Sequence, residues 1–320
     1  MDTLPVMPAH ELTRREPEHR WLIEGLWGAD AVGTIGGEPK CCKSFLALGM
    51  AVSVASGRPC LERFVPKRTG RVLLFVAEDA LHVVRERLAA ICAHFHLDLV
   101  DLDLWVITAP AIRIDVEEDR RRLARTVADL KPVLLILDPF VRLHRIDENV
   151  SAAVVPLLAF LREIQRRYAC AVALVHHARK GAGKVRAGQA LRGSSEFHAW
   201  SDSSLFLRRR GDQLHMSVEH RAHPSLSGIA LNLHTTSSSM ALVASGQPAE
   251  ATDPIPPQQA SPRDRVLQAL AEMDHPLHIR DLRSRCRIRT ATLCSILDEL
   301  KADELVTKTG GGWLSCQPPP

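Results

Sequence analysis

A short segment between residues 36 and 44 restricts the fold more than any other part of the sequence. It reads Gly-Gly-Glu-Pro-Lys-Cys-Cys-Lys-Ser, follows the apolar run Val32–Ile35 and opens a helical pattern from Lys43 to Ser56. A glycine-bearing turn between a strand and a helix presents consecutive backbone N–H groups that bind phosphate oxygens. In such loops a lysine binds the terminal phosphates and the next hydroxyl binds Mg²⁺. The segment therefore predicts a phosphate-binding loop.

The segment departs from the usual pattern at one position. The pattern places glycine immediately before the lysine, and this chain has Cys42 there. A side chain at this position restricts the backbone angles and crowds the phosphate. The alternatives are a loop that has lost nucleotide binding and a pair of redox-sensitive thiols. We expect nucleotide binding, with Lys43 on the β- and γ-phosphates and Ser44 on Mg²⁺; the residues expected around the nucleotide are Gly36, Gly37, Glu38, Pro39, Lys40, Cys41, Cys42, Lys43, Ser44 and Phe45.

Carboxylates follow two other apolar runs. The run Val133–Leu137 ends in Asp138, and Val72–Val76 leads to Glu78 and Asp79. An acid at the carboxyl end of a parallel strand faces the ligand crevice, so Asp138 is expected to hold Mg²⁺ through water, with a plain turn residue as the alternative. Hydrolysis needs a base that orients water. We favour Glu78 over Asp79, because it is the first carboxylate after the strand and reaches further. The alternative is a helix N-cap pair, with Asp79 just before Ala80 and Leu81.

Two histidines follow the apolar run Ala171–Val175. A polar side chain at the end of that strand is placed to contact the γ-phosphate and to report its loss to the segment beyond. Single histidines are more often structural, but a pair at the ligand edge of a sheet favours function. His176 and His177 are therefore added to the candidate site.

The pattern up to residue 245 alternates short apolar strands with amphipathic helices. Such alternation is typical of an α/β fold with βαβ units on a parallel sheet. The runs Ser203–Arg208 and Leu214–Glu219 flank a turn at residues 210–212 and predict a hairpin at the edge of the sheet. The earlier strands and helices expected are Val32–Ile35, Lys43–Ser56, Arg71–Val76, Leu88–Ala93, Trp105–Thr108, Val116–Leu130, Val133–Leu137, Ala152–Tyr168 and Ala171–Val175.

A change of composition separates the C-terminal part of the chain. Residues 246–262 carry five prolines and almost no large apolar side chain, which indicates an extended linker. Three helical patterns and two short strands joined by a glycine-rich turn then predict a winged helix-turn-helix domain over 263–316. The expected elements are Arg263–Met273, Ile279–Ser284, Thr290–Ala302, Leu305–Lys308 and Trp313–Ser315. The expected organisation is an N-terminal extension at 1–20, a core at 21–245, the linker and this domain.

Composition and charge exclude several classes of protein. The chain of 320 residues is 46% hydrophobic and 24% charged, which excludes a disordered or collagen-like chain. Its apolar runs fall far short of the ~20 residues of a membrane span, and its start lacks a secretory pattern. The eight cysteines form no Cys-x-x-Cys pair. We therefore expect a cytoplasmic protein without a membrane partner. The net charge of +4 does not by itself indicate a nucleic-acid binder.

Taken in order, these motifs resemble the RecA-like ATPases, and most closely the RepA-type hexameric helicases of plasmids with their phage and mobile-element relatives. The resemblance covers about residues 20 to 235, and the segments that carry it are the loop, Trp21–Leu26, Ala77–Asp79, Leu137–Pro139, His176–His177 and Leu191–Ser195. It implies a RecA-like P-loop core in a homo-oligomeric, hexamer-type ring that binds ATP and Mg²⁺ between subunits and passes single-stranded DNA through its centre. It also implies that Glu78 is the catalytic glutamate.

The resemblance further implies an arginine supplied by the neighbouring subunit. Relatives often carry a Lys-x-Arg pair on a late strand, where this chain has Glu219-His220-Arg221. Arg221 is therefore the expected residue, with Arg208 and Arg210 as the next choices. A basic segment after the histidine pair is expected to follow the DNA backbone, with a plain loop as the alternative; its residues are Arg179, Lys180, Lys184 and Arg186.

The function expected from these features is an ATP-dependent DNA helicase or replication ATPase of a mobile genetic element. The alternatives are an ATP-controlled DNA-binding regulator or helicase loader, and a RecA- or RadA-like recombinase. A replication initiator or a primase is the expected protein partner. Arginines near the third C-terminal helix favour contact with duplex DNA over contact with protein; they are Arg280, Arg283, Arg285, Arg287 and Arg289.

Overall fold

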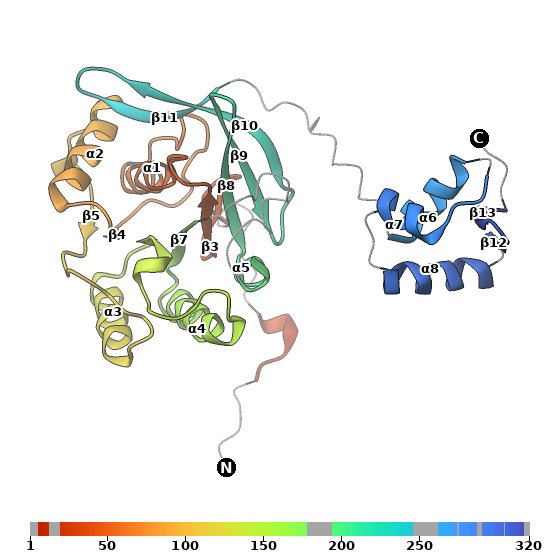
Figure 1. Cartoon of the computed structure of the whole chain (residues 1–320). Coiled ribbons are helices and arrows are strands. Elements are labelled where there is room, and N and C mark those ends of the chain that lie inside the picture. The colour runs from red at the N-terminus through yellow and green to blue at the C-terminus, as the bar shows by residue number, and fades with distance from the viewer. Residues whose placement is uncertain are drawn as a thin grey trace, which may run out of the picture. The chain divides into compact units, whose positions relative to one another are not determined.

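The computed structural model of the chain describes residues 6–12, 20–177, 194–245, 262–273, 275–286, 290–303 and 305–316. These described residues divide into two compact units, one within Met1–Ala251 and the other within Thr252–Pro320. Figure 1 shows the elements of both. Within the described residues, no helix combines the length and the apolar character that a membrane crossing requires.

The first unit is built on a sheet whose central strands are parallel. The order across this part of the sheet is β8-β3-β7-β6-β4-β5. Parallel strands covered on both faces are apolar along their whole length, and every residue of β3, β4 and β6 is buried. The bounds are β3 Val32–Gly37, β4 Val72–Val76, β5 Leu104–Val106, β6 Leu134–Asp138, β7 Ala171–His177 and β8 Ser203–Arg210. The α/β architecture expected from the sequence is confirmed.

The sheet continues beyond β8 as an antiparallel meander of β9 (Gln213–His220), β10 (Leu226–Thr235) and β11 (Met240–Ser245). The predicted hairpin is present as β8 and β9, which pair from Ser203↔His220 to Arg210↔Gln213. Its expected position at the sheet edge is wrong, because β10 and β11 lie outside it. The sequence of β10 predicts a strand only weakly, because a half-exposed strand needs few apolar side chains. Its fully buried residues are Ile229 and Leu231.

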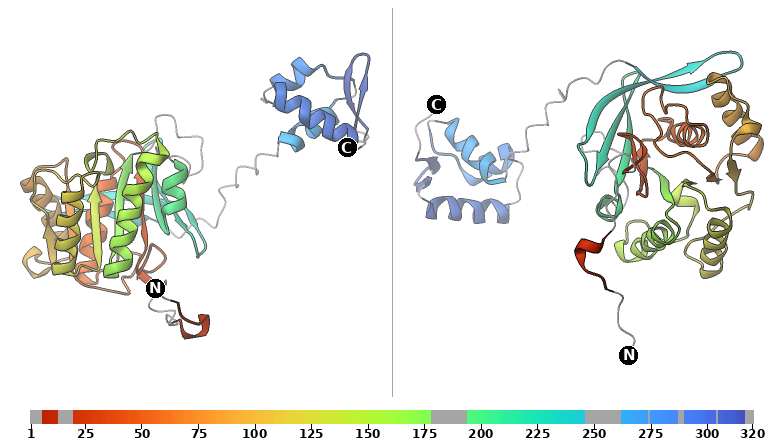
Figure 2. Two further views of the ribbon diagram at one scale, coloured as in Figure 1. Left: turned by 90° about the horizontal axis from the view of Figure 1, so that it is seen from below. Right: turned by 180° about the vertical axis from the view of Figure 1, so that it is seen from behind.

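Helices cover both faces of this sheet (Figures 1 and 2). On one face α1 (Lys43–Ser56) and α2 (Leu81–His94) pack over an apolar cluster that includes Leu46, Met50 and Ile91. On the other, α3 (Glu117–Leu130), α4 (Ser151–Tyr168) and α5 (Ser194–Trp200) pack over a second cluster. Short elements complete the unit: η1 Ala9–Glu11, β1 Trp21–Ile23, β2 Trp27–Gly28, η3 Leu99–Asp101 and η4 Phe140–Arg142.

The second unit contains α6 (Pro262–Ala271), α7 (Ile279–Cys286) and α8 (Thr290–Ala302), followed by the antiparallel hairpin β12 (Val306–Thr309) and β13 (Gly312–Ser315). Each helix contributes to an apolar cluster through residues such as Val266, Leu282 and Leu297. The helices and the hairpin follow in the order that the sequence predicts.

Candidate nucleotide-binding site

The predicted phosphate-binding loop lies between the end of β3 and the start of α1. The Lys43 ammonium donates a hydrogen bond to the Glu38 carbonyl at 2.7 Å, and the Cys41 thiol donates to the same oxygen at 2.7 Å. Lys43 is 5% exposed. Glu38 is half-buried, whereas Pro39 and Lys40 are exposed. The loop therefore closes tightly around the lysine side chain.

Two residues of this loop hold backbone angles that usually favour glycine. Lys40 and Cys42 both have φ of 61°, in the left-handed region. Cys42 is the residue that stands in place of the glycine expected before Lys43. It is the N-cap residue of α1 and has a ψ of 25°. A non-glycine residue in this conformation costs about 1–2 kcal/mol. The chain thus keeps the left-handed conformation at Cys42 without glycine, and the half-buried thiol is accommodated there.

Gly36 and Gly37 end β3, where Gly37 has a φ of 151°. A β-carbon at Gly37 would lie 2.4 Å from the Leu207 carbonyl oxygen and 2.7 Å from Cys41 Sγ. This close approach between the loop and β8 requires glycine. The Cys41 thiol is buried at the same contact, and burial raises its pKa above the ordinary value. Cys41 is therefore a protonated packing group rather than a reactive thiolate.

The side chain of Ser44, at the start of α1, lies within hydrogen-bonding reach of the carboxylate of Asp138, at the end of β6. Asp138 is 4% exposed, and burial raises the pKa of its carboxyl to about 6, with further contributions from the charges of Glu78 and Asp79. Lys43 acts in the opposite direction and lowers it. The predicted residues from three separate strand ends therefore lie close enough to interact electrostatically.

The donor set at Ser44 and Asp138 fits Mg²⁺. Magnesium prefers oxygen ligands and is usually held by one or two protein groups together with water and substrate phosphates. Among the described residues, no group of three or more His, Cys, Asp or Glu side chains could hold a metal ion. A hydroxyl and one buried carboxylate beside a phosphate-binding loop match a site in which water and phosphates complete the coordination of Mg²⁺. They do not match a site in which the protein supplies every ligand.

Replacing Asp138 with asparagine is expected to stabilise the Mg²⁺-free protein while removing Mg²⁺-dependent turnover. The carboxyl pKa is about 6 in the folded state against 3.8 as a free group, so ionisation at neutral pH costs about 3 kcal/mol of folding free energy. The gain from Asp138→Asn should be complete above pH 6 and vanish below about pH 4. Urea unfolding at pH 4 and pH 8 measures it. An equal gain at both values would show a packing effect instead.

Glu78 and Asp79, which follow β4, each have an arginine partner. Arg142 Nε on η4 donates to Glu78 Oε1 at 3.0 Å. Asp79 forms an ion pair with Arg87 of α2. The Ala77 N–H donates to the Asp138 carbonyl oxygen at 2.7 Å and holds this segment beside the end of β6. Because the Glu78 and Arg142 side chains are 44% and 58% exposed, their pair contributes at most about 1 kcal/mol and is easily broken.

The histidine pair ends β7, which lies directly beside the loop strand. In the parallel register His176 pairs with Gly36 and His177 with Gly37. His176 is 1% exposed, and its ring stacks on Phe197 at 4.3 Å between centroids and meets the edge of Phe140 at 5.7 Å. His177 is half-buried. The position fits the prediction, but the packing of His176 favours a structural role for its ring, which leaves His177 as the more accessible imidazole.

Arg221, the arginine expected to act on a neighbouring subunit, follows β9 and lies on its own unit's surface. Its Nε is 3.6 Å from Asp202 Oδ1, its guanidinium donates to the Ala199 carbonyl, and its side chain is 54% exposed. Arg208 stacks over the Phe206 ring at 5.7 Å. The basic residues expected to follow DNA, namely Arg179, Lys180, Lys184 and Arg186, lie outside the described residues.

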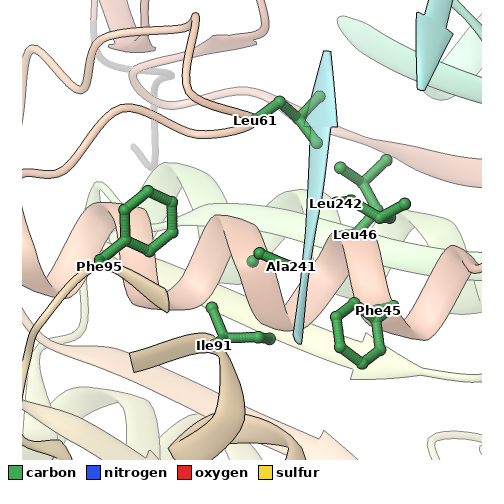
Figure 3. Close-up of a pocket in the computed structure, with 8 residues that line it drawn as sticks. Phe45, Leu46, Leu61, Ile91, Phe95, Ala241 and Leu242 are labelled. Carbon is green, nitrogen blue, oxygen red and sulfur yellow. The ribbon is translucent and has the colours of Figure 1, made fainter. Parts of the chain in front are cut away.

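The side chain of Phe45, the last of the residues expected around the nucleotide, lines a small apolar pocket (Figure 3). This pocket lies between α1, α2 and β11, where Phe45 meets Ile91, Phe95 and Leu242. Its volume is about 10 Å³, enough for about one water molecule. The Phe45 side chain is therefore part of the packing between these elements, while its backbone belongs to the first turn of α1.

Sequence reasoning missed the residues of η4 and the segment after it. Arg142 holds Glu78, Phe140 packs against His176, and His144 Nε2 lies 3.4 Å from Glu148 Oε1 with both side chains buried. These residues follow Asp138 by two to ten positions. The available signal was the position of Arg142 four residues after the metal-site aspartate, which places a cation beside the carboxylates at the same sheet edge.

Comparisons with known proteins bear on this site. A family profile described as "AAA domain" matches residues 2–183, which include β3, β4, β6 and β7 with their site residues. The fold is also similar to that of a solved structure described as a DnaB-like replicative helicase and its interactions with primase, with a TM-score of 0.50 and 13% sequence identity. The alignment covers 67% of this chain and 57% of that one, so this chain spans less than two thirds of that helicase.

Proposed function

Because the chain belongs to the AAA domain family, we propose that it is an ATP- and Mg²⁺-dependent motor with a RecA-like core that acts on DNA as an oligomer. Its motifs resemble those of the RepA-type hexameric helicases, and the proposed role is a helicase or replication ATPase of a mobile genetic element. A replication initiator or a primase is the proposed partner.

The observation that carries this proposal is the close approach of the Ser44 side chain to the Asp138 carboxylate, with Lys43 beside them. It joins the phosphate-binding loop to the end of β6 and brings a cation, a hydroxyl and a carboxylate together at the ligand edge of the parallel sheet. Open α/β sheets bind ligands at this edge. The whole set is supplied by segments within the matched family region, residues 2–183.

In the proposed reaction, backbone N–H groups of residues 37–44 bind the phosphates and Lys43 leaves the Glu38 carbonyl to bind the terminal phosphates. Ser44 and Asp138 would hold Mg²⁺, which would supply positive charge beside the γ-phosphoryl group as that group is transferred. Glu78, released from Arg142, orients the attacking water and accepts its proton. His177, at the end of β7, contacts the γ-phosphate in this proposal.

The proposed oligomer would complete this site with Arg221 from a neighbouring subunit. A planar guanidinium that reaches the γ-phosphate stabilises transition-state charge. In the chain alone Arg221 is held by Asp202 and the Ala199 carbonyl, so its delivery would require these contacts to break. Slow hydrolysis by monomers follows from this arrangement.

For the C-terminal unit we propose a winged-helix domain over 263–316, joined by a linker at 246–262 to a core at 21–245, with residues 1–20 as an extension. The order of α6, α7, α8 and the β12–β13 hairpin supports this assignment, as does the isolated antiparallel bridge between Leu277 and Trp313, which ties the segment before α7 to the hairpin. Such domains commonly bind duplex DNA.

The test of the proposed function is steady-state ATP hydrolysis with and without single-stranded DNA, combined with a mass measurement of the nucleotide-bound assembly. We expect DNA-stimulated turnover by an oligomer that unwinds a forked duplex. Assembly and turnover without unwinding would favour a regulator or loader. Strand exchange between homologous duplexes would favour a recombinase. No ATP turnover under any condition would contradict the proposal.

A chain ending at residue 245 is expected to keep ATP turnover without DNA within about twofold of the full chain. The apolar clusters on both faces of the sheet consist of residues before 245, while the cluster around Val266 and Leu297 consists of later ones. The two units therefore have separate apolar cores. Thermal unfolding of the truncated protein provides the control. A large fall in its melting temperature would show that the two units share a core.

A further inference from the structure

The C-terminal unit contains a groove between the start of α7 and the β12–β13 hairpin. Backbone hydrogen bonds of 2.8 and 2.9 Å join Leu277, just before α7, to Trp313 in β13. Gly312 packs so closely that a β-carbon there would lie 2.4 Å from the Leu277 carbonyl oxygen. The hairpin is therefore fixed against the helix start, and the groove of about 680 Å³ between them is a built feature of the fold.

The groove is cationic. Its lining includes Arg280 from α7 and Lys308 from β12, both exposed, with His278 between them and a single carboxylate, Asp281. Among the ion pairs of the described residues, Arg280 and Lys308 have no carboxylate partner within 4.0 Å, whereas Arg263 on α6 pairs with Asp303. Unpaired cations that face one groove attract an anionic ligand.

The exposed face of α8 has the opposite character. Beyond its first turns, which present Thr292 and Ser295, the exposed residues include Asp298 and Glu299, with Lys301 as the nearby cation. Laying this face into a DNA groove would bring two carboxylates toward the phosphates. Phosphate contacts supply most of the affinity of a protein for DNA. The third helix is therefore less suited to contact DNA than the surface of α7 and the hairpin.

The groove also distinguishes duplex from single-stranded DNA. Single strands are bound by stacking their bases on exposed aromatic rings. The aromatic residue that lines this groove, Trp313, is only 5% exposed, and Lys308 Nζ covers its ring at 5.7 Å. The exposed ring in the described lining is the His278 imidazole, so the groove offers little stacking surface, while Thr309 and the backbone of Gly310 add polar groups suited to phosphate oxygens.

We propose that this groove binds the phosphate backbone of duplex DNA, and that α7 and the hairpin, rather than the exposed face of α8, form the duplex-binding surface of the chain. This inference rests on the proposed function only in taking DNA as the polymer. It names the surface that contacts the duplex, which the charge pattern near the third helix in the sequence does not.

The test compares two lysines of the same unit, one in the groove and one on α8. In the full chain without ATP, Lys308→Glu is expected to weaken binding of a fluorescent 20-base-pair duplex about tenfold and to lower the slope of log affinity against log salt by about 1. Arg280→Glu should act similarly. Lys301→Glu makes the same charge change on α8 and should alter affinity less than twofold. Fluorescence anisotropy over a salt series measures all three.

Several outcomes would overturn the proposal. They are an equal or larger loss with Lys301→Glu, an unchanged affinity with Lys308→Glu, and an equal loss for a single strand of the same length. If Lys308→Glu lowers the melting temperature, Lys308→Ala decides, with an expected loss of about threefold. ATP turnover of the unmodified chain without DNA is measured on the same preparation. Its absence would end the motor proposal and leave the duplex measurements valid.

Discussion

Replacement of Lys43 with alanine is expected to lower ATP turnover on the order of 10³-fold, the effect of removing one well-placed electrostatic contact from a transition state. The side chain is buried in the loop, and its ammonium lies beside the Glu38 carbonyl and within electrostatic reach of Asp138. Without it, the charge on the terminal phosphates has no protein cation beside the start of α1. Steady-state phosphate release and binding of a fluorescent ATP analogue together measure the loss.

Lys67→Ala is the matched control for this variant. Lys67 forms a surface ion pair with Glu24 at 3.0 Å. Its removal changes the net charge by the same amount, but the pair contributes at most about 1 kcal/mol to the free energy of unfolding. Its turnover should match that of the unmodified chain. Full turnover by Lys43→Ala, with a normal melting temperature, would place the nucleotide site elsewhere.

Glu78→Gln is expected to bind ATP with nearly unchanged affinity and to hydrolyse it about 10²- to 10⁴-fold more slowly, because the amide cannot accept the proton of the attacking water. The change also replaces a charged partner of Arg142 with a neutral one. Since that pair is exposed, the fold should tolerate the loss. Single-turnover hydrolysis and equilibrium binding separate the chemical step from affinity.

Asp79→Asn tests the choice between the two neighbouring carboxylates. Asp79 is engaged by Arg87 of α2, so its replacement should loosen the start of that helix and lower turnover modestly, about tenfold or less. The opposite ranking, with Asp79→Asn the slower enzyme, would assign the base to Asp79. Similar losses from both would indicate that the two acids act as one charged cluster around Asp138.

The strands and helices around the site could be predicted from the sequence because apolar runs and helical periodicity there are long and distinct. β3, β6 and α1 begin and end within about a residue or two of the expected positions. The strands β10 and β11 were missed; β10 has few buried residues and many small or polar ones. Its pairing with β9 depends on contacts distant in sequence, which local periodicity does not encode.

The sequence allowed the main polar and charged residues of the candidate site to be predicted, but not their backbone conformations or their partners. Lys43, Ser44 and Asp138 occupy fixed positions in a sequence pattern, whereas the left-handed backbone at Cys42 depends on how β8 and the loop pack. The partner of Glu78 was not predictable either, because Arg142 reaches it from η4 across 64 positions of sequence. The stacking of His176 on Phe197 likewise joins segments that only the folded chain brings together.

The strand order has one more consequence. β7 separates β3 from β6 in the sheet, and neighbouring strands are about 4.8 Å apart. A ligand held by both the loop and Asp138 would therefore lie beside the end of β7, next to His177. Any change of side chain at His177 would then be felt by the ligand itself and not only by the strand.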